Sequence, residues 1–251
     1  MMVMPALALL LGLSAASEAH AQTAPPPAPP PRGWHGTFGG GVQWHAAATD
    51  QTGFNLGGAL LRVSPIWSQA LDGDLTYAKV KTTGLDQIVA DAQNVRYTLQ
   101  RDLRPRVFMA LRPAFKRNEV QGVDYRFEET VGVGFRLVQQ PKAQITVVPT
   151  LGLVQQEKNI AALNNETASG GVLQTVTVAI NAMSSFSQML QYQADLQNTD
   201  DNRLQFEMRL NTQIAGPIGL QLTYLFDREN IVVAGVNSAD QDLRLSFNFR
   251  F

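Results

Sequence analysis

Cysteine is absent from the sequence. This suits a chain that crosses an oxidising periplasm without thiols to mispair, although small cytosolic proteins can lack cysteine too. Long apolar runs are also missing: after the N-terminal region no window holds about 18 consecutive apolar residues, so no transmembrane helix is expected. Neither sign of charge dominates. The 20 basic and 21 acidic residues give a net charge of −1 with no basic block, which argues against a nucleic-acid partner.

Residues 1–32 are typical of the start of an exported chain. Residues 5–17 form an apolar stretch of signal-peptide length, and residues 19–21 form an A-x-A cleavage pattern, with no Lys or Arg before the stretch. We therefore predict a signal peptide over residues 1–21, with a buried N-terminal helix as the alternative. Residues 23–32 contain six prolines, which favour extended polyproline II. Residues 22–32 are interpreted as a periplasmic leader, with a partner-binding site as the alternative.

From Gly33 onward, apolar and polar residues alternate in segment after segment. Residues 203–214 are a clear example, with an apolar face made of Leu204, Phe206, Met208, Leu210 and Ile214. The positions between them are polar and include Arg203, Glu207 and Arg209. A period of two indicates strands with one apolar and one polar face. We count about twelve such segments between residues 33 and 251.

Three features favour a membrane barrel over a soluble β-sandwich, which also alternates. Long charged side chains occupy the middle of the polar faces, as a wet lumen would accept, and aromatic residues cluster near the segment ends like the girdles of barrels. Short connections such as 64–66 and 215–217 alternate with long ones, which include 156–171 and 227–241. The predicted fold is an all-β, antiparallel up-and-down transmembrane β-barrel of about 12 strands over residues 33–251, located in the cell outer membrane after export.

The last segment adds a targeting feature. Residues 243–251 read LRLSFNFRF, and their apolar face ends in Phe247, Phe249 and Phe251. This resembles the C-terminal strand signal that is read by the outer-membrane barrel-assembly machinery. We therefore expect the outer-membrane lipid bilayer as a partner, and the barrel-assembly machinery and periplasmic chaperones as partners during biogenesis.

Residues 121–137, QGVDYRFEETVGVGFRL, resemble the central motif of the YdiY-like salt-induced outer-membrane proteins, a family defined by a domain of unknown function (family 481). The matching positions are Gly122, Val123, Asp124, Tyr125, Arg126, Phe127, Gly132, Gly134, Phe135 and Arg136. The resemblance covers most of residues 36–251, and residues 49–53 match the family's opening hairpin only loosely. It implies an outer-membrane barrel and brings no settled activity. We expect structural roles first for the motif: Gly122 in a turn, Gly132 and Gly134 making room on the inner face, and Tyr125 in the girdle.

The polar faces are expected to line the lumen. The ionisable residues that would form an ion path or a plug there are Arg96, Arg106, Arg112, Lys116, Arg126, Glu128, Arg136, Arg203, Glu207, Arg209, Asp242, Arg244 and Arg250. With Asp72, Asp74 and Asp195 they leave an excess of about four positive charges, which predicts a weak anion preference in an open lumen. The other interpretation is that bases and acids pair across the bore and plug it, since about twelve strands give a bore narrower than that of a porin.

No catalytic or metal centre is expected. Only His35 and His45 follow the predicted cleavage site, no G-x-S-x-G motif is present, and Ser169, placed in the longest loop, has no recognisable partner. Two histidines without cysteine give no metal-ligand spacing, and residues 227–229 are interpreted as solvated loop charge. We expect a non-enzymatic barrel without cofactor or metal, in a structural or stress-related role. The alternatives are a narrow solute channel with weak anion preference and, more remotely, a lipid-modifying enzyme.

Overall fold

The computed structural model describes residues 33–45, 50–82, 85–120, 122–159, 165–232 and 238–251. The predicted signal peptide and leader, residues 1–32, lie outside this part of the chain. Within it, no helix is long and apolar enough to span a bilayer.

The described residues form twelve strands. In chain order they are β1 (Gly33–His45), β2 (Asp50–Val63), β3 (Trp67–Thr82), β4 (Leu85–Arg104), β5 (Val107–Asn118), β6 (Val123–Gln140), β7 (Ala143–Lys158), β8 (Asn165–Ala179), β9 (Ser184–Asp195), β10 (Asn202–Ala215), β11 (Ile218–Glu229) and β12 (Ala239–Arg250).

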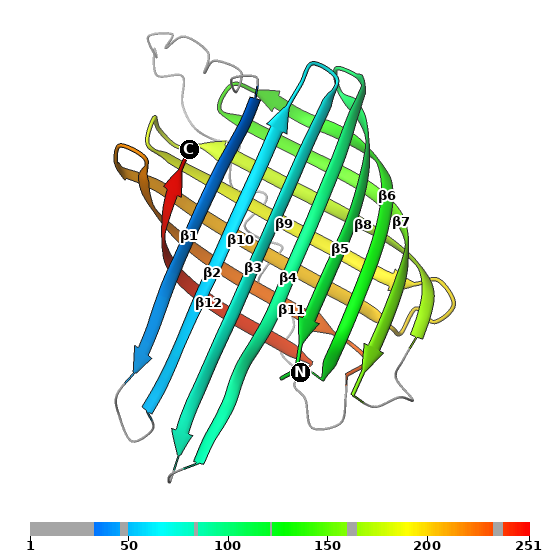
Figure 1. The fold of residues 1–251 in the computed structure, drawn as a ribbon. Coiled ribbons are helices and arrows are strands. Elements are labelled where there is room, and N and C mark those ends of the chain that lie inside the picture. The colour runs from blue at the N-terminus through cyan, green and yellow to red at the C-terminus, as the bar shows by residue number, and fades with distance from the viewer. Residues whose placement is uncertain (1–32, 46–49, 83–84, 121, 160–164, 233–237) are drawn as a thin grey trace, which may run out of the picture.

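The strands close into a barrel. Each strand pairs antiparallel with its chain neighbours, and the pairing of β1 with β12 completes the ring (Figure 1). Because the number of strands is even, Gly33 and Phe251 lie at the same end, which we call the terminal end; the opposite end is the loop end. The predicted fold, an antiparallel up-and-down barrel of twelve strands, is confirmed.

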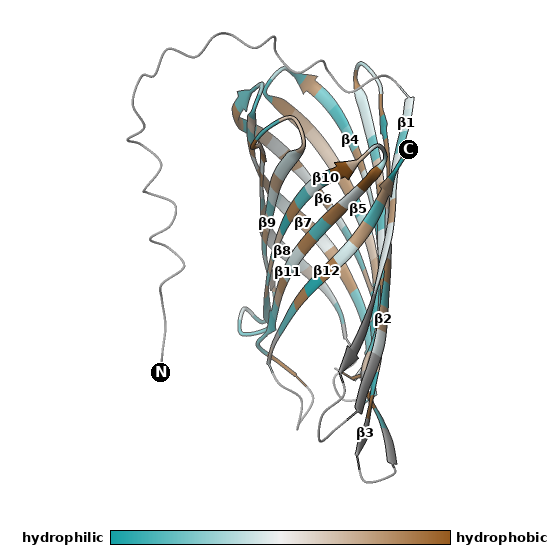
Figure 2. Ribbon diagram, turned by 90° about the vertical axis from the view of Figure 1, so that its left-hand side faces the viewer, coloured by the Kyte–Doolittle hydropathy of each residue, from teal (hydrophilic) through white to brown (hydrophobic). Residues whose placement is uncertain are grey.

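Apolar side chains cover the outside of this barrel. Apolar and polar residues alternate along the strands, as Figure 2 shows on β10 to β12. On β12, Leu243, Leu245, Phe247 and Phe249 are between 50% and 64% exposed. A closed barrel that presents such a surface is in contact with hydrocarbon rather than water. The chain is therefore a transmembrane barrel of the kind found in the outer membrane, as predicted.

The rim of the apolar surface is marked at the terminal end by two arginine–tryptophan pairs. The Arg62 guanidinium lies 5.6 Å from the centroid of the Trp34 ring on the neighbouring strand, and the Arg101 guanidinium lies 5.2 Å from the centroid of the Trp67 ring. Stacking of a cation on an aromatic face is favourable, and both side chains combine an apolar body with a polar tip. Such pairs are suited to the boundary between lipid and water.

The connections at the loop end differ from the prediction. Residues 156–171 are mostly strand, because β7 continues to Lys158 and β8 starts at Asn165. Residues 227–229 likewise belong to β11. Between β3 and β4 only residues 83–84 intervene, since the ladder runs on until Thr82 pairs with Leu85. Many residues predicted to lie in loops therefore belong to strands that are longer than expected. The prediction that connections at the loop end are the long ones is wrong for the β3–β4 connection.

The β1–β12 contact, which we call the seam, is short and rich in glycine. Its register pairs cover only residues 37–40 of β1, whereas β1 pairs with β2 along its whole length. Gly36 and Phe251 exchange two backbone hydrogen bonds of 3.0 Å each beyond the last register pair. A Cβ on Gly39 would lie 2.5 Å from the carbonyl oxygen of Phe247. Glycine at this position lets the two strands approach closely enough to close the barrel.

Candidate functional site

Polar side chains from alternate strand positions line the lumen. On β6, Arg126, Glu128 and Arg136 are each 8% exposed, whereas the outward-facing Val131 and Phe135 are more than 40% exposed. Successive side chains of a strand point to opposite faces, so the charged set points inward. Three groups of inward residues define the lumen: an ion-pair cluster, a packed region near the terminal end, and two polar cavities.

The ion-pair cluster joins strands on opposite sides of the lumen. Its members are Lys116, Arg126, Glu128, Lys158, Arg203, Asp227 and Glu229. The Asp227 carboxylate accepts hydrogen bonds from Lys116 Nζ at 2.8 Å and from Arg203 Nη2 at 2.6 Å. Arg203 Nη1 also donates to Glu128 Oε1 at 3.0 Å. Since β5 and β6 do not neighbour β10 and β11 in the barrel, the Lys116–Asp227 and Arg203–Glu128 bonds cross the bore.

Every carboxylate of the cluster has at least two cationic partners. Arg126 contacts both Glu128 and Glu229, and Lys158 Nζ lies 3.5 Å from Glu229 Oε2. Buried charges are costly unless they are paired and hydrogen-bonded, and this degree of pairing meets that requirement. The cluster therefore fills its part of the lumen and ties β5 and β6 to β10 and β11.

The interpretation of residues 227–229 as solvated loop charge is wrong. Asp227 and Glu229 lie on β11 and point inward to the cluster, and Glu229 stands opposite Arg203 in the ladder. The alternation along β11 already indicates that residues 227 and 229 face inward. Its outward apolar residues, Leu222 to Phe226, occupy even positions, so continuing the same period places residues 227 and 229 on the inner face.

Near the terminal end an apolar group packs inside the barrel. It consists of Phe108 and Ala110 of β5, Val148 of β7, Leu173 of β8 and Met189 of β9. The sequence did not predict this group. Where a strand carries apolar side chains on both its lipid face and its inner face, apolar and polar residues no longer alternate, and the prediction rests on that alternation. This side of the lumen is closed by side-chain packing rather than by charge.

Arg136 covers this apolar group. Its guanidinium lies 4.8 Å from the centroid of the Phe108 ring, Nη2 donates to Asp102 Oδ1 at 2.6 Å, and Nη1 donates to the Pro105 carbonyl at 3.0 Å. The Phe108 ring occupies the space where a Cβ of Gly134 would be, so glycine is needed there for close approach. Phe108 and Arg136 together block the β5–β6 side at the terminal end.

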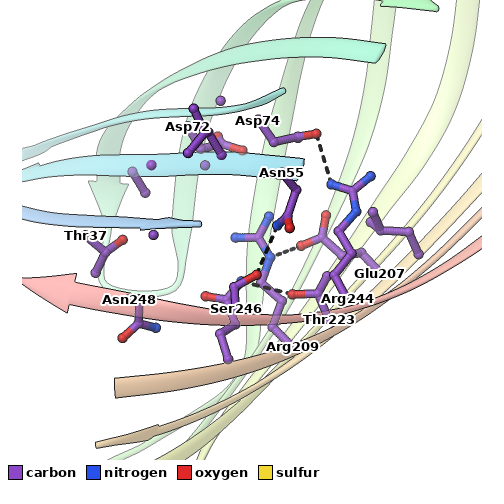
Figure 3. Close-up of a pocket in the computed structure, with 18 residues that line it drawn as sticks. Thr37, Asn55, Asp72, Asp74, Glu207, Arg209, Thr223, Arg244, Ser246 and Asn248 are labelled. Atoms are coloured by element: carbon purple, nitrogen blue, oxygen red, sulfur yellow. Dashed lines mark hydrogen bonds and ion pairs between the residues drawn. The ribbon is translucent and has the colours of Figure 1, made fainter. Parts of the chain in front are cut away.

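Two polar cavities lie elsewhere in the lumen. The first, of about 100 Å³, is toward the terminal end and is lined by β1, β2, β3, β10, β11 and β12 (Figure 3). The second, of about 110 Å³, is toward the loop end and is lined by β3, β4, β5 and β9 to β12. They share four lining residues, namely Asp74, Glu207, Leu225 and Arg244. The two cavities therefore adjoin along the barrel axis.

An ion pair crosses the place where the cavities meet. Arg244 Nη1 of β12 donates to Asp74 Oδ2 of β3 at 3.2 Å, and β1 and β2 separate these strands in the barrel (Figure 3). We call this pair the Asp74–Arg244 bridge. Arg244 Nε also contacts Asp242 Oδ2 at 2.5 Å, and Glu207 contacts Arg209 beside it. The bridge divides an otherwise continuous polar space.

Two residues expected in the lumen lie at its rim. Arg106 occupies the turn between β4 and β5 and is exposed, and Arg250, the last residue of β12, is exposed as well. Both positions fall where strands end and water begins, so the period of two no longer determines which way a side chain points. Their assignment to the lumen is corrected accordingly.

Asp195, also expected inside, is buried and lines a small lumen pocket together with Arg126 and Arg203, and it also serves a turn. Its Oδ1 accepts hydrogen bonds from the backbone N–H groups of Gln197 at 2.7 Å and Asn198 at 3.3 Å, in the connection from β9 to β10. Such side-chain to backbone bonds are typical of aspartate in turns. In the same connection, partial burial raises the pKa of the Asp201 carboxyl.

These placements change the charge of the lumen. The predicted set had ten bases and six acids, an excess of four. Arg106 and Arg250 leave it, while Lys158, Asp102, Asp227 and Glu229 join it. Nine bases then face nine acids, because two of the ten bases leave and one joins, and three acids join the six. The overall excess is therefore zero, so a general anion preference loses its basis and any anion selectivity is local.

The central motif, residues 121–137, contributes two residues to the cluster. Gly122 has φ = 68° in the connection from β5 to β6, a left-handed conformation that favours glycine. Asp124 and Tyr125 are exposed, and a Cβ on Gly132 would lie 2.5 Å from the Pro149 carbonyl oxygen. Arg126 and Glu128 are the motif residues that reach the cross-lumen ion pairs, with Glu229 and Arg203 respectively. The motif thus shapes the barrel wall and anchors the cluster.

The candidate catalytic residues lie apart. Ser169 is a buried residue of β8 that accepts a hydrogen bond from Gln193 Nε2 at 2.8 Å, which corrects its predicted loop position. His35 lies on β1, which does not neighbour β8, and the His45 side chain is outside the described part. Among the described residues no three histidine or acidic side chains are grouped as a metal site would require.

Several solved outer-membrane barrels are similar to this chain in fold. The NanC porin is 9% identical, with a TM-score of 0.49 over 86% of this chain and 97% of that one. An outer membrane channel from Pseudomonas putida F1 is 11% identical, with a TM-score of 0.49 over 94% and 99%. The translocator domain of the autotransporter NalP from Neisseria meningitidis is 11% identical, with a TM-score of 0.48 over 87% of each chain. Values this low say nothing about a shared solute or activity.

Sequence comparison identifies the family directly. No curated protein matches the chain. The model of a family described as "Protein of unknown function, DUF481" matches residues 40–251, which include the central motif and all strands from β2 to β12. The predicted family is confirmed, and the chain belongs to the DUF481 family.

Proposed function

We propose that this barrel is a narrow, non-catalytic passage for small polar solutes across the outer membrane, with the Asp74–Arg244 bridge as its constriction. The observation that carries this function is the pair of adjoining polar cavities whose common wall contains a cross-lumen ion pair. Hydrogen-bonding residues such as Asn55, Thr223 and Asn248 line the first cavity and suit a hydrated solute.

The bridge has the properties of a constriction that yields. The side chains of Arg244 and Asp74 are 13% and 33% exposed, so water screens their attraction more than it screens the buried cluster. Arg244 keeps Asp242 as a partner when it releases Asp74, which lowers the cost of moving. The bridge is therefore easier to displace than the ion-pair cluster.

Planar-bilayer recordings on the refolded full chain test this function. We expect a small conductance for the wild type and a larger one for Arg244→Ala and Asp74→Ala, because each substitution removes one side of the bridge. Arg117→Ala is the matched control, since Arg117 pairs with Glu119 at the exposed loop end. A barrel that carries no current in the wild type and in both bridge variants is not a passage.

A closed barrel with a structural or stress-related role is the second candidate. The ion-pair cluster and the apolar group near Phe108 support it, because the apolar group packs between β5 and β9 and the cluster links β5 and β6 to β10 and β11 across the lumen. In that case the two cavities hold only trapped solvent. No current is then expected from any substitution at Asp74 or Arg244.

We propose further that the outward aromatic face of β12 is what the barrel-assembly machinery and periplasmic chaperones recognise. Phe247 and Phe249 on β12 and Phe251 directly after it are each at least 50% exposed, and β12 forms the seam. Replacing Phe249 and Phe251 by serine is expected to reduce the fraction of chain that reaches the outer membrane in folded form, measured by heat-modifiable mobility in gels. An unchanged folded fraction would remove this role.

A further inference from the structure

A third pocket lies in the lumen between the ion-pair cluster and the apolar group. It has a volume of about 40 Å³, and its lining includes Arg96 of β4, Arg112 of β5 and Gln191 of β9. Its wall also carries Lys116, Arg126 and Arg203, and its one acidic residue is Glu128. The pocket is thus lined by five cations and a single carboxylate.

Arg112 differs from the other buried arginines of the lumen. It is 9% exposed, and among the described residues no carboxylate lies within ion-pair distance of its guanidinium. Nη1 donates to Gln191 Oε1 at 3.4 Å and Nη2 to Met189 Sδ at 3.9 Å. Both are long contacts to neutral acceptors. By contrast, Arg126 and Arg203 each contact two carboxylates.

Arg96 points to the same place. Its Nη1 donates to Met189 Sδ at 3.5 Å, and its nearest carboxylate oxygen, Asp72 Oδ1, is 3.7 Å away. Two guanidinium groups therefore converge on one thioether, which is a weak acceptor. Like charges repel at this range, and a buried cation without a close anion is costly. A barrel that only needed to be filled would gain from an apolar residue at position 112.

We propose that this pocket is a binding site for a small oxyanion, such as inorganic phosphate or a short carboxylate, held between Arg112 and Arg96. The planar guanidinium presents paired N–H donors that match two oxygens of one anion, and such charge-assisted bonds are stronger than those to neutral acceptors. The Gln191 amide supplies a neutral hydrogen-bonding group beside Arg112. A monatomic anion lacks the second acceptor, so the site selects oxyanions over chloride. Binding does not depend on whether the barrel conducts.

Calorimetric titration of the refolded full chain in detergent micelles tests the site. Inorganic phosphate and acetate are the probes, and chloride at equal ionic strength is the competitor. We expect saturable phosphate binding that chloride displaces poorly, and binding about tenfold or more weaker in Arg112→Gln, as loss of hydrogen bonds to a charged group implies. Arg117→Gln is the matched control on the same strand and should bind as the wild type does.

Two more variants keep the test decisive if Arg112→Gln does not fold. Arg112→Lys retains the charge and loses the paired donors, so the preference for phosphate over chloride should fall. Arg96→Gln should weaken phosphate binding without abolishing it. Absence of saturable phosphate binding in the wild type, or wild-type affinity in Arg112→Gln, overturns the site. If the barrel binds phosphate but carries no current, only the proposed passage function is contradicted. If it carries current but does not bind phosphate, only the proposed oxyanion site is contradicted.

Discussion

Glu128 shows how a single residue holds the lumen together. It is 8% exposed and accepts from Arg126 and Arg203, on strands from opposite sides of the bore. Removing one partner of a buried ion pair leaves the other charge uncompensated, which costs more than the pair itself contributes. The cluster is therefore sensitive to substitution at its carboxylates even though it is costly to build.

Glu128→Gln is expected to lower the free energy of unfolding by about 3–5 kcal/mol, the range measured when a buried pair loses one partner. Urea unfolding in lipid vesicles, followed by tryptophan fluorescence, is the measurement. Glu119→Gln is the control, because Glu119 and Arg117 form an exposed pair that contributes about 1 kcal/mol or less. Equal effects of the two substitutions would mean that the cluster is not the anchor described here.

At the level of the strand, the seam between β1 and β12 is the strand pair with the fewest paired residues. Its register pairs stop at residue 40 of β1, and close approach depends on Gly39, which faces the Phe247 carbonyl. On β2, Gly57 faces the same lumen, yet a Cβ there would lie at an ordinary 3.5 Å from the Gly73 carbonyl oxygen. Glycine is therefore required at the first position and only tolerated at the second.

Gly39→Ala is expected to lower the temperature at which the folded barrel unfolds in heat-modifiability gels, because the new Cβ must push the β12 backbone away. Gly57→Ala, the same change at an unobstructed site, should leave that temperature nearly unchanged. Matching behaviour of the two variants would show that seam contact does not limit barrel stability.

Strand patterns predict this fold well and fail in identifiable places. The alternation along residues 203–214 gives the faces of β10 correctly, because each strand separates lipid from lumen. It fails at strand ends, as with Arg106, where water surrounds both faces. It also misses Phe108, since an apolar residue on the inner face looks no different from one that faces lipid. Asp227 was lost only because the prediction ended the strand too early.

The alternation of apolar and polar residues cannot predict which side chains pair across the lumen. The bridge from Asp74 to Arg244 joins residues 170 positions apart, and the inward face of each strand says nothing about which distant strand it meets. The same holds for Arg112, whose lack of a carboxylate partner emerges only when the neighbouring strands are in place. The inward set of residues is thus predictable, and its division into pairs is not.

For the whole molecule, the lumen combines packed regions with polar cavities. Apolar side chains pack between β5 and β9, and ion pairs link β5 and β6 to β10 and β11. One cavity lies along β1 to β3 and β10 to β12, and the cavity that adjoins it also reaches β4, β5 and β9. With nine bases against nine acids, its net charge gives no overall preference for one sign of ion. Passage, where it occurs, is set by the Asp74–Arg244 bridge and by local sites.

The most direct test of this arrangement uses the absence of cysteine in the natural sequence. Current through Asp74→Cys barrels is recorded in a planar bilayer before and after a bulky thiol reagent is added. Leu71→Cys, on the outer face of the same strand and 41% exposed, is the control. We predict that the reagent reduces the current of Asp74→Cys and leaves that of Leu71→Cys unchanged. An Asp74→Cys barrel that carries no current, or whose current the reagent does not alter, contradicts a passage at the bridge.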